Sequence, residues 1–301
     1  MNLKKFVLLI IALLMIVVLV LAYTFYGKIY KPNTIANGTL FIPSNSSIEN
    51  VEEIARPYLK RVKPFIWVSK LKKYDKNIKP GKYSITRDMS NNDLVNLLRS
   101  GQQTPVKLSF NNQDSFEKLA GRVSVQLETD SIALLEAFSD RQFLKNSGFS
   151  ESTALGMYIP NTYEFFWNTS AEEFRNRMLA EYRRFWNNQR TELANAKGLT
   201  QNEVITLASI VQKETAKVGE RKRVAGLYLN RLNDGWPLQA DPTIIFALKK
   251  KFGQEMIIRR VLTKDLEIDS PYNTYKKKGL PPGPIAMPDI SSIDAVLNAE
   301  E

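Results

Sequence analysis

Carboxylates, hydroxyls, lysines and tyrosines are the side chains that could perform chemistry in this chain, because its 301 residues include no Cys and no His. Without His, a Ser-His-Asp triad, a His general base and an HExxH zinc site are excluded. Without Cys, a thiolate nucleophile, a disulfide framework and a Cys zinc site are excluded. Any catalysis by the chain as given must come from the remaining groups or from a bound cofactor.

Glu214 is the carboxylate whose position points most clearly to chemistry. Residues 200–203 (Thr-Gln-Asn-Glu) form a capping box, which predicts a helix over 200–217. The apolar arc of this helix consists of Val204, Ile205, Leu207, Ala208, Ile210, Val211 and Thr215, and its narrow polar face of Thr206, Ser209 and Lys213. Glu214 falls at the edge of the arc, where partial desolvation would raise its pKa and keep it protonated as a general acid. The same spacing also fits a boundary glutamate paired with Lys217 or Arg221.

Two further carboxylates lie close to Glu214 in the sequence. Glu203 is explained by its place in the capping box. Glu220 stands beside Arg221 near the start of a second predicted helix, which is more typical of a structural ion pair. We therefore keep Glu220 only as a supporting candidate.

The chain is basic, with 42 Lys and Arg against 31 Asp and Glu and a formal net charge of +11. This charge suits anionic partners such as phospholipid headgroups, acidic wall polymers or nucleic acid. The basic clusters lie at 60–63, 70–76, 249–251 and 276–278, and each also fits an ordinary solvated surface. Because aromatic residues do not interleave with Lys and Arg along an evident recognition strand or helix, the sequence predicts no nucleic-acid partner.

Residues 6–23 form an unbroken apolar segment without a charge, preceded by Lys4 and Lys5. At about 1.5 Å per residue, this segment nearly crosses a hydrocarbon core of about 30 Å, and residues 24–26 (Thr-Phe-Tyr) lengthen it. The basic leader predicts a single span of the cytoplasmic membrane, with the N-terminus in the cytoplasm and the rest of the chain outside. A cleaved signal peptide is the competing interpretation, but residues 20–23 (Val-Leu-Ala-Tyr) offer no small-x-small site.

A small α/β module is predicted after a juxtamembrane linker. Its expected elements are a strand at 39–43, a helix capped by Ser46 or Ser47, a strand at 81–85, and a helix that Ser90 caps and Gly101 ends. Beyond the module, helical periodicity dominates. The expected elements there are a strand at 106–110 and helices near 114–127, 131–138, 170–195, 200–217, 219–234 and 241–252. Two segments depart from this periodicity, at 156–167 and 270–288, and loops of such length more often line a site than merely connect helices.

Residues 207–215 (Leu-Ala-Ser-Ile-Val-Gln-Lys-Glu-Thr) resemble the catalytic signature of the YceG-like endolytic murein transglycosylases. Further segments resemble the family in register, at 156–163, 220–221, 224–225, 230–232, 238–243, 270–275 and 279–285. The apolar N-terminal segment and the small module, which looks like a LysM-type wall-binding fold, occur in the family's order. Several separated motifs in register are far more specific than any one of them.

The resemblance implies an α+β chain of four parts. These are a transmembrane anchor over 1–26, a linker over 27–38, a LysM-like α/β module over 39–103, and a mainly helical catalytic domain with some strands over 104–301. It implies cleavage of the MurNAc–GlcNAc bond of nascent peptidoglycan, with formation of a 1,6-anhydro ring and the end of strand elongation. The implied partners are the glycan strands, the membrane, and a penicillin-binding protein of the wall-synthesis machinery.

Within this family pattern Glu214 carries the acid/base role, and no metal or cofactor is required. Polar residues that could bind sugar or stem peptide are Asn230, Arg231, Gln239, Asp241, Tyr272, Asn273 and Tyr275. Arg231 and Asp241 fit a structural ion pair equally well.

Some positions depart from the family pattern. Gln212 stands where the family often has Glu, and members with Gln there make Glu214 the residue that carries over. Asn161 replaces a usual Asp and Leu155 a frequent Glu, so we assign no chemistry to their loop. The family's domain normally continues beyond the position of Glu301, with a strand-rich end that carries a His, so we expect the sequence to be partial.

Two other functions remain open from the sequence. A non-catalytic peptidoglycan-binding scaffold of the wall-synthesis machinery would need the same anchor and module but would release no products. A basic membrane protein that binds nucleic acid would need cytoplasmic topology and steeply salt-dependent binding.

Overall fold

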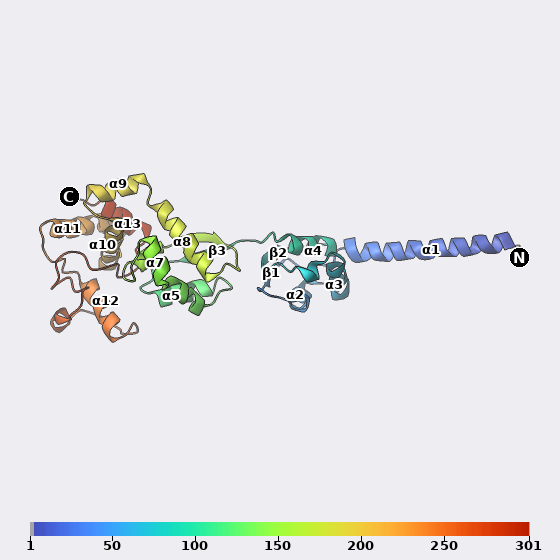
Figure 1. Ribbon diagram of the computed structural model, residues 1–301, viewed down its shortest axis with the longest axis horizontal. Helices are drawn as coiled ribbons and strands as arrows, with labels where there is room; N and C mark the ends of the chain where they lie inside the picture. The colour runs from blue at the N-terminus through green and yellow to red at the C-terminus, as the bar shows by residue number, and fades with distance from the viewer. Residues whose placement is uncertain (1–2, 301) are drawn as a thin grey trace. The chain divides into compact units, whose positions relative to one another are not determined.

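The computed structural model describes residues 3–300; residues 1 and 2 of the predicted anchor and residue 301 of the predicted catalytic domain lie outside the described residues. The chain divides into two compact units (Figure 1). The first comprises Met1–Val106 and Glu164–Asn168, and the second Lys107–Tyr163 and Thr169–Glu301. Both units are rich in helix and contain few strands, so the expected α+β class is confirmed.

The first unit begins with α1 (Leu3–Tyr30), a single helix of 28 residues. Its most apolar window of 18 residues has a mean hydropathy of 3.3, and the side chains of that window are exposed. By length and composition α1 could cross a membrane. The helix continues to Tyr30, inside the range 27–38 that the sequence suggested as a linker.

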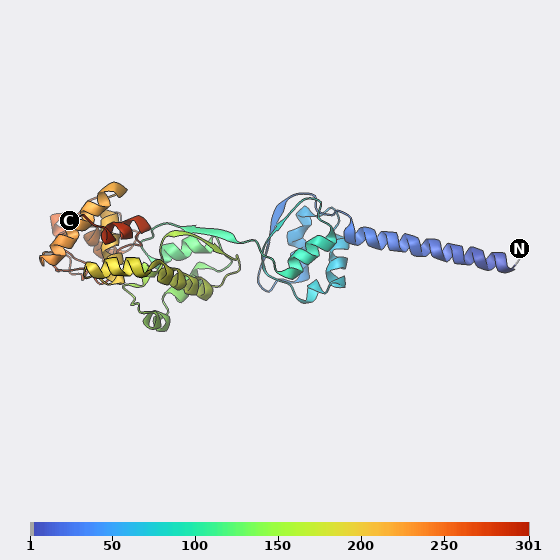
Figure 2. The same ribbon diagram turned by 90° about the horizontal axis from the view of Figure 1, so that it is seen from above.

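The module that follows α1 is built on a two-stranded antiparallel sheet, in which β1 (Gly38–Ile42) pairs with β2 (Gly81–Ile85). The register sets Gly38 opposite Ile85 and Ile42 opposite Gly81. Helices α2 (Ile48–Ala55) and α3 (Val62–Leu71) lie between the strands in sequence, and α4 (Asn91–Ser100) follows β2 (Figure 2). Two short 3-10 turns, η1 (Arg56–Tyr58) and η2 (Tyr74–Lys76), join them.

Local signals account for most of this module. Ser90 caps α4 as the sequence predicted, and of the two caps predicted for α2 it is Ser47 that serves; in both helices the structure shows a full capping box. Gly101 ends α4 with φ 73°, a left-handed conformation that favours glycine. The helix α3 was not predicted, because no side chain caps its first residue.

The second unit contains a second two-stranded sheet and most of the helices. Two strands, β3 (Val106–Phe110) and β4 (Asn161–Phe165), lie mostly in this unit, and its other elements are α5 (Phe116–Ser124), α6 (Ser131–Phe138), α7 (Arg141–Ser147), η3 (Ala154–Met157), α8 (Ala171–Phe185), α9 (Asn188–Ala196), α10 (Gln201–Glu214), η4 (Val218–Glu220), α11 (Arg221–Asn233), α12 (Asp241–Phe252), η5 (Thr263–Glu267) and α13 (Ile290–Leu297). The strand β3 pairs with β4. Among the α-helices and strands that the structure describes in this unit, the sequence missed α7, α13 and the strand β4 inside the aromatic segment 156–167.

The predicted helix over 170–195 is wrong as a single element. It is broken into α8 and α9 because Trp186 leaves the helical region at ψ 67° and the Asn187 side chain caps a new helix. The helix predicted over 200–217 ends earlier, at Glu214, because Thr215 is extended. A short 3-10 turn then precedes α11 where one helix over 219–234 was expected.

Helix α10 is the centre of the second unit. It packs against α13, α11, α12 and α9 (Figure 1). All residues from Val204 to Val211 are buried, including two of the three residues assigned to its narrow polar face. That assignment is wrong for Thr206 and Ser209, because their hydroxyls donate to backbone carbonyls one turn back and can therefore be buried.

Candidate active site

Glu214 is the last residue of α10 and the next residue, Thr215, turns away in an extended conformation. The side chain of Glu214 is exposed. The expectation of a partly desolvated carboxyl is therefore wrong for this structure. The apolar arc buries α10 only as far as Val211, so the final residues of the helix project beyond the core.

Tyr228 of α11 is the direct partner of this carboxyl. Its phenolic hydroxyl donates to Oε2 of Glu214 at 3.2 Å. The tyrosine itself is only 3% exposed. Burial, followed by the charge and the hydrogen bond of Glu214, raises the pKa of Tyr228. The hydroxyl therefore keeps its proton and remains a donor at neutral pH.

A second tyrosine–carboxylate pair lies within electrostatic reach of Glu214. The hydroxyl of Tyr275 donates to Oδ1 of Asp241 at 2.5 Å. Burial raises the pKa of Tyr275 to about 12, with further contributions from the hydrogen bond and charge of Asp241 and from the charge of Glu214. The positive charge of Arg231 lowers the same pKa. The structure thus gathers Glu214, Arg231 and Tyr275, all predicted site residues, around Tyr228, and Tyr275 in turn binds Asp241.

A buried threonine holds Tyr275 next to Asp241. The hydroxyl of Thr274 accepts the backbone N–H of Ala240 at 3.1 Å and shares a hydrogen bond of 2.8 Å with the hydroxyl of Thr243. These bonds join the loop over 270–288 to the first turn of α12, which begins at Asp241. This loop therefore contributes Tyr275 to the cluster around Tyr228.

Gln239 shapes the turn between α11 and α12. Its φ is 53°, in the left-handed region that non-glycine residues seldom adopt. Its backbone N–H donates to the Thr274 carbonyl at 3.0 Å, which compensates for the strain. Its side chain is exposed, and in the sequence it lies close to Asp241 of the cluster.

Arg231 makes a different contact from the ion pair considered from the sequence. Its guanidinium donates to the carbonyl of Leu238, across the turn that follows α11. No ion pair joins Arg231 to Asp241 in the part of the chain that the structure describes. Arg231 therefore braces the turn and, through its charge, influences the tyrosine of the site.

Other predicted binding residues lie in structural surroundings. Asn273 is 1% exposed and binds the carbonyls of Leu266 and Ile268 through its side-chain amide at 2.8 Å each. Tyr272 is 2% exposed and packs on Phe246 with ring centres 4.6 Å apart. These contacts shape the loop and leave little surface for a sugar. By contrast, Asn230 is exposed on α11.

Glu220 is paired at the surface. Its carboxylate accepts from the Thr215 hydroxyl at 2.9 Å and lies 3.0 Å from the Lys217 ammonium. The hydrogen bonds from Lys217 and Thr215 lower the pKa of Glu220. A carboxyl held in its charged form is unsuited to a general acid, and Glu220 instead fastens the turn that follows Glu214.

Three residues near the site were not predicted as contributors. Tyr228 shares a helical face with Arg221 and Ala225, and that spacing was the signal available in the sequence. The side-chain oxygen of Gln212 accepts from the backbone N–H of Asp289 at 2.6 Å, and the hydroxyl of Ser209 accepts from Ile285 at 3.0 Å. These last two fix α10 to segments more than seventy residues away, for which the sequence carries no local signal.

A small cavity of about 140 Å³ lies between α10 and α12 and is lined by neighbours of the cluster in the sequence. Its lining includes Lys213 and Pro242, the sequence neighbours of Glu214 and Asp241, and also the aromatic ring of Phe246. Lys213 is held there by Asp114, whose carboxylate lies 2.6 Å from the ammonium. An apolar wall with a few polar groups suits a ring face or acyl chain of a ligand.

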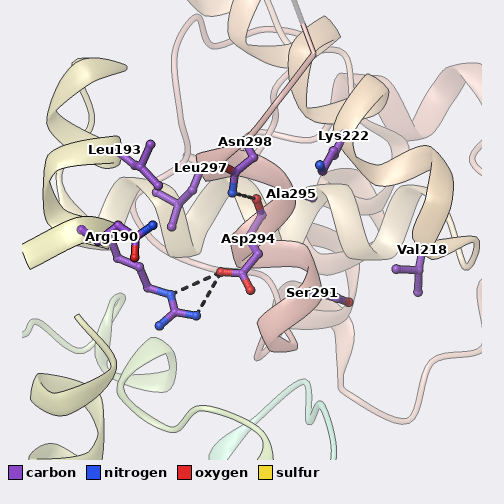
Figure 3. Close-up of a pocket in the computed structure, with 10 residues that line it drawn as sticks. Arg190, Leu193, Val218, Lys222, Ser291, Asp294, Ala295, Leu297 and Asn298 are labelled. Atoms are coloured by element: carbon purple, nitrogen blue, oxygen red, sulfur yellow. Dashed lines mark hydrogen bonds and ion pairs between the residues drawn. The ribbon is translucent and has the colours of Figure 1, made fainter. Parts of the chain in front are cut away.

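A larger cavity, of about 480 Å³, lies elsewhere, between α9, α11 and α13 (Figure 3). Arg190 and Asp294, which both line it, form an ion pair at 3.3 Å, and Lys222 lies on its α11 side. The predicted site residues do not line it, so we do not take its greater volume as a sign of the active site. Within residues 3–300, no group of three or more acidic side chains is placed to hold a metal ion.

Comparison with known proteins gives the same family as the motifs. The model of the YceG-like family matches residues 40–301. A protein of Streptococcus pneumoniae strain D39 named endolytic murein transglycosylase is 30% identical, over 86% of this chain and 52% of its own length. The Bacillus subtilis strain 168 protein of the same name is 29% identical, over 86% of this chain and 75% of its own length. The chain thus spans about half the length of the streptococcal relative.

The fold is also similar to a solved structure. A crystal structure described as a yceG-like protein from Listeria monocytogenes matches with a TM-score of 0.58 and 28% sequence identity. The match covers 88% of this chain and 91% of the other.

Proposed function

The chain belongs to the YceG-like family, and from this premise we propose that it is a membrane-anchored endolytic lytic transglycosylase of nascent peptidoglycan. Its relatives in Streptococcus and Bacillus are named endolytic murein transglycosylases. The observation that carries the proposal is the exposed carboxyl of Glu214, held by Tyr228 at one oxygen and grouped with Tyr275 and Asp241.

The proposed reaction uses one carboxyl twice. Protonated Glu214 donates its proton to the oxygen between MurNAc and GlcNAc as the bond from that oxygen to C1 of MurNAc breaks. The carboxylate then accepts the proton of the C6 hydroxyl of the same MurNAc while O6 bonds to C1. A 1,6-anhydro ring results and Glu214 regains its proton. Because the attacking oxygen is tethered to the sugar, no second carboxylate is needed as nucleophile.

Tyr228 explains how an exposed carboxyl serves this reaction. Its hydrogen bond engages Oε2 of Glu214, which leaves Oε1 to carry the proton toward the substrate. A bound glycan strand would cover Glu214, and exclusion of water favours the neutral carboxyl that the first step needs. The exposed side chains of Asn230, Gln239 and Asp241 would offer hydrogen bonds to sugar or stem peptide.

The remaining parts fit action at the membrane surface. We propose α1 as an anchor in the cytoplasmic membrane, with the second unit outside the cell, and the module over 39–103 as a LysM-like wall-binding part. A tethered enzyme that cuts within new strands would end their elongation. A penicillin-binding protein of the wall-synthesis machinery is the proposed partner, which co-purification under mild detergent would test.

The decisive experiment is product analysis with purified full-length protein and murein sacculi. We expect the wild type to release fragments with 1,6-anhydro ends, detected by liquid chromatography and mass spectrometry. Glu214→Gln should lower this release at least about a hundredfold, the scale of lost acid–base catalysis. Glu192→Gln, which changes an exposed glutamate of α9, is the matched control and should release as much as the wild type.

The same experiment separates the enzyme from a scaffold. A scaffold would bind sacculi and release nothing above background, with or without Glu214. Release that is equal in the wild type and in Glu214→Gln would mean that another residue is the catalyst.

A further inference from the structure

The end of α1 is packed against the module of the first unit. The rings of Phe25 and Trp67 lie with their centres 5.4 Å apart. The ammonium of Lys28 lies 5.4 Å from the first ring centre and 5.6 Å from the second. The amide of Asn91 donates to the Lys28 carbonyl at 2.8 Å, and Ile29 packs against the module core. The module is therefore fixed to the helix end through α3 and α4, which both views place beside it (Figures 1 and 2).

Helix α3 has an outward face that its own module covers only in part, since Trp67 is half-buried against the module core while Lys63 and Lys70 are exposed. Phe65, Val68 and Ser69 are buried on the inner side. Lys63, Trp67 and Lys70 have the spacing i, i+4 and i+7, which places them together on the opposite side. Leu71, at the end of the helix, borders this side and is 56% exposed. An aromatic ring, an aliphatic chain and two ammonium groups thus share one face, which we call the α3 face.

The contact between Phe25 and Trp67 sets the depth of the α3 face. A span of about 20 residues crosses the hydrocarbon core, so a span that begins at Phe6 reaches the far boundary near Phe25. Trp67 touches Phe25 and must therefore lie at the level of the lipid headgroups. Tryptophan is enriched at this level, and lysines close to the surface are attracted by anionic lipids.

We propose that the α3 face, made of Lys63, Trp67, Lys70 and Leu71, docks on the membrane surface and binds anionic phospholipid headgroups. This inference rests on the anchoring of α1 in the proposed function. Docking restricts the tilt of the module relative to the bilayer, because the module then has two attachments, the end of α1 and the α3 face. The first unit would hold its glycan-binding part at a defined height above the membrane.

The absence of Cys from the chain allows a direct test with single reporters. Full-length variants Val17→Cys, Leu71→Cys and Ser84→Cys carry an environment-sensitive fluorophore and are reconstituted into vesicles of phosphatidylcholine with phosphatidylglycerol. Nitroxide lipids quench either at headgroup level or at the bilayer centre. Ser84 is an exposed control on β2, which lies farther from α1 than α3 does in both views (Figures 1 and 2).

We expect the central nitroxide to quench position 17, the headgroup nitroxide to quench position 71, and neither to quench position 84. Adding Lys63→Glu and Lys70→Glu should reduce quenching at position 71 at least twofold, as should replacing phosphatidylglycerol with phosphatidylcholine. The matched control is Lys145→Glu with Lys251→Glu, which changes the net charge equally at two exposed sites of the second unit and should have no effect.

Two results would overturn the inference. One of them leaves the proposed anchoring of α1 intact, and the other overturns the anchoring as well. If position 17 is quenched and position 71 is quenched no more than position 84, the module does not dock, while the anchor stands. If position 17 is not quenched, the anchor fails and the docking fails with it. Neither result depends on murein cleavage, so the enzymatic proposal is judged separately.

Discussion

The two oxygens of Glu214 are not equivalent, since one accepts from the buried hydroxyl of Tyr228 and the other does not share that partner. A carboxyl on an exposed helix end would otherwise rotate freely and lose orientation between encounters with substrate. Tyr228 is rigid because it is buried in α11. Its role under the proposed function is therefore to position the catalytic group rather than to react.

Tyr228→Phe tests this role at the scale of one residue. We expect kcat for murein cleavage to fall about two- to tenfold, the effect of one hydrogen bond of about 0.5–1.5 kcal/mol. KM and the melting temperature Tm should change little, since Phe fills nearly the same volume as the Tyr228 side chain. Tyr163→Phe, which removes a hydroxyl bonded to the Ile159 carbonyl at 2.7 Å, is the control and should leave kcat unchanged. An unchanged kcat in Tyr228→Phe would argue against positioning.

At the scale of elements, the site depends on the clamp between α10, α11 and α13. Gln212 of α10 accepts from the first residues of the α13 segment, Asp289 and Ser292. Arg221, the first residue of α11, is 5% exposed, and one of its nitrogens donates to both oxygens of Asp289 at 2.8 and 3.0 Å. Three helices thus meet at Asp289. This junction sets where α11, and with it Tyr228, lies against the end of α10.

The ion pair in this junction predicts how stability depends on pH. Although burial acts in the opposite direction, hydrogen bonds from Ser291, Ser292 and Arg221 lower the pKa of Asp289 from its usual 3.8. A carboxyl whose pKa is lower in the folded chain than in the unfolded chain stabilises the fold. The stabilisation is complete when the pH is above the pKa of the unfolded chain. That contribution is lost as the pH falls through the folded value. The junction should therefore be intact at pH 7 and weakened near pH 3.

Asp289→Asn should reduce the free energy of unfolding at pH 7 by about 1–3 kcal/mol, since it leaves a buried guanidinium without its charge partner. At pH 3 the difference from the wild type should be smaller, because below the unfolded pKa of about 3.8 the unfolded chain takes up the proton and the contribution of the pair to stability declines. Urea unfolding at the two pH values measures both. Asp294→Asn, which removes the more exposed ion pair with Arg190, should reduce the free energy of unfolding by less than Asp289→Asn does. An Asp289→Asn effect that is equal at pH 7 and pH 3 would contradict the linkage.

At the scale of the whole molecule, the two units carry different tasks under the proposed function. The first contains the apolar helix and the small module, and the second contains the clustered site residues. Under the proposed anchoring, the charge distribution around α1 would decide on which side of the membrane both units lie. Lys4 and Lys5 precede the apolar segment, and positive residues favour the cytoplasmic side.

Cysteine accessibility in intact cells tests this topology. Lys107→Cys places a thiol on an exposed residue at the start of the second unit, and Lys4→Cys places one before the apolar segment. We expect a membrane-impermeant maleimide to label position 107 in intact cells, and position 4 only after permeabilisation. Labelling in the reverse order would place the second unit in the cytoplasm, where nascent wall is absent.

The sequence by itself determined the features that depend on neighbours along the chain. The Ser90 cap and the capping box at Thr200 marked the starts of α4 and α10, and Gly101 marked the end of α4. The apolar run gave α1, and the motif around Glu214 gave the family. Each of these signals is local, because a cap, a left-handed glycine or an apolar stretch acts within a few residues.

Only the tertiary structure decided how the site is assembled. Tyr228 reaches Glu214 because α11 packs on α10, and Tyr275 reaches Asp241 because Thr274 ties two segments more than thirty residues apart. The exposure of Glu214 also depends on where the packed core ends, whereas helical periodicity gives only the side of the helix on which a residue lies. Contacts between distant segments follow from the packing of whole elements. A pattern along one helix cannot specify them.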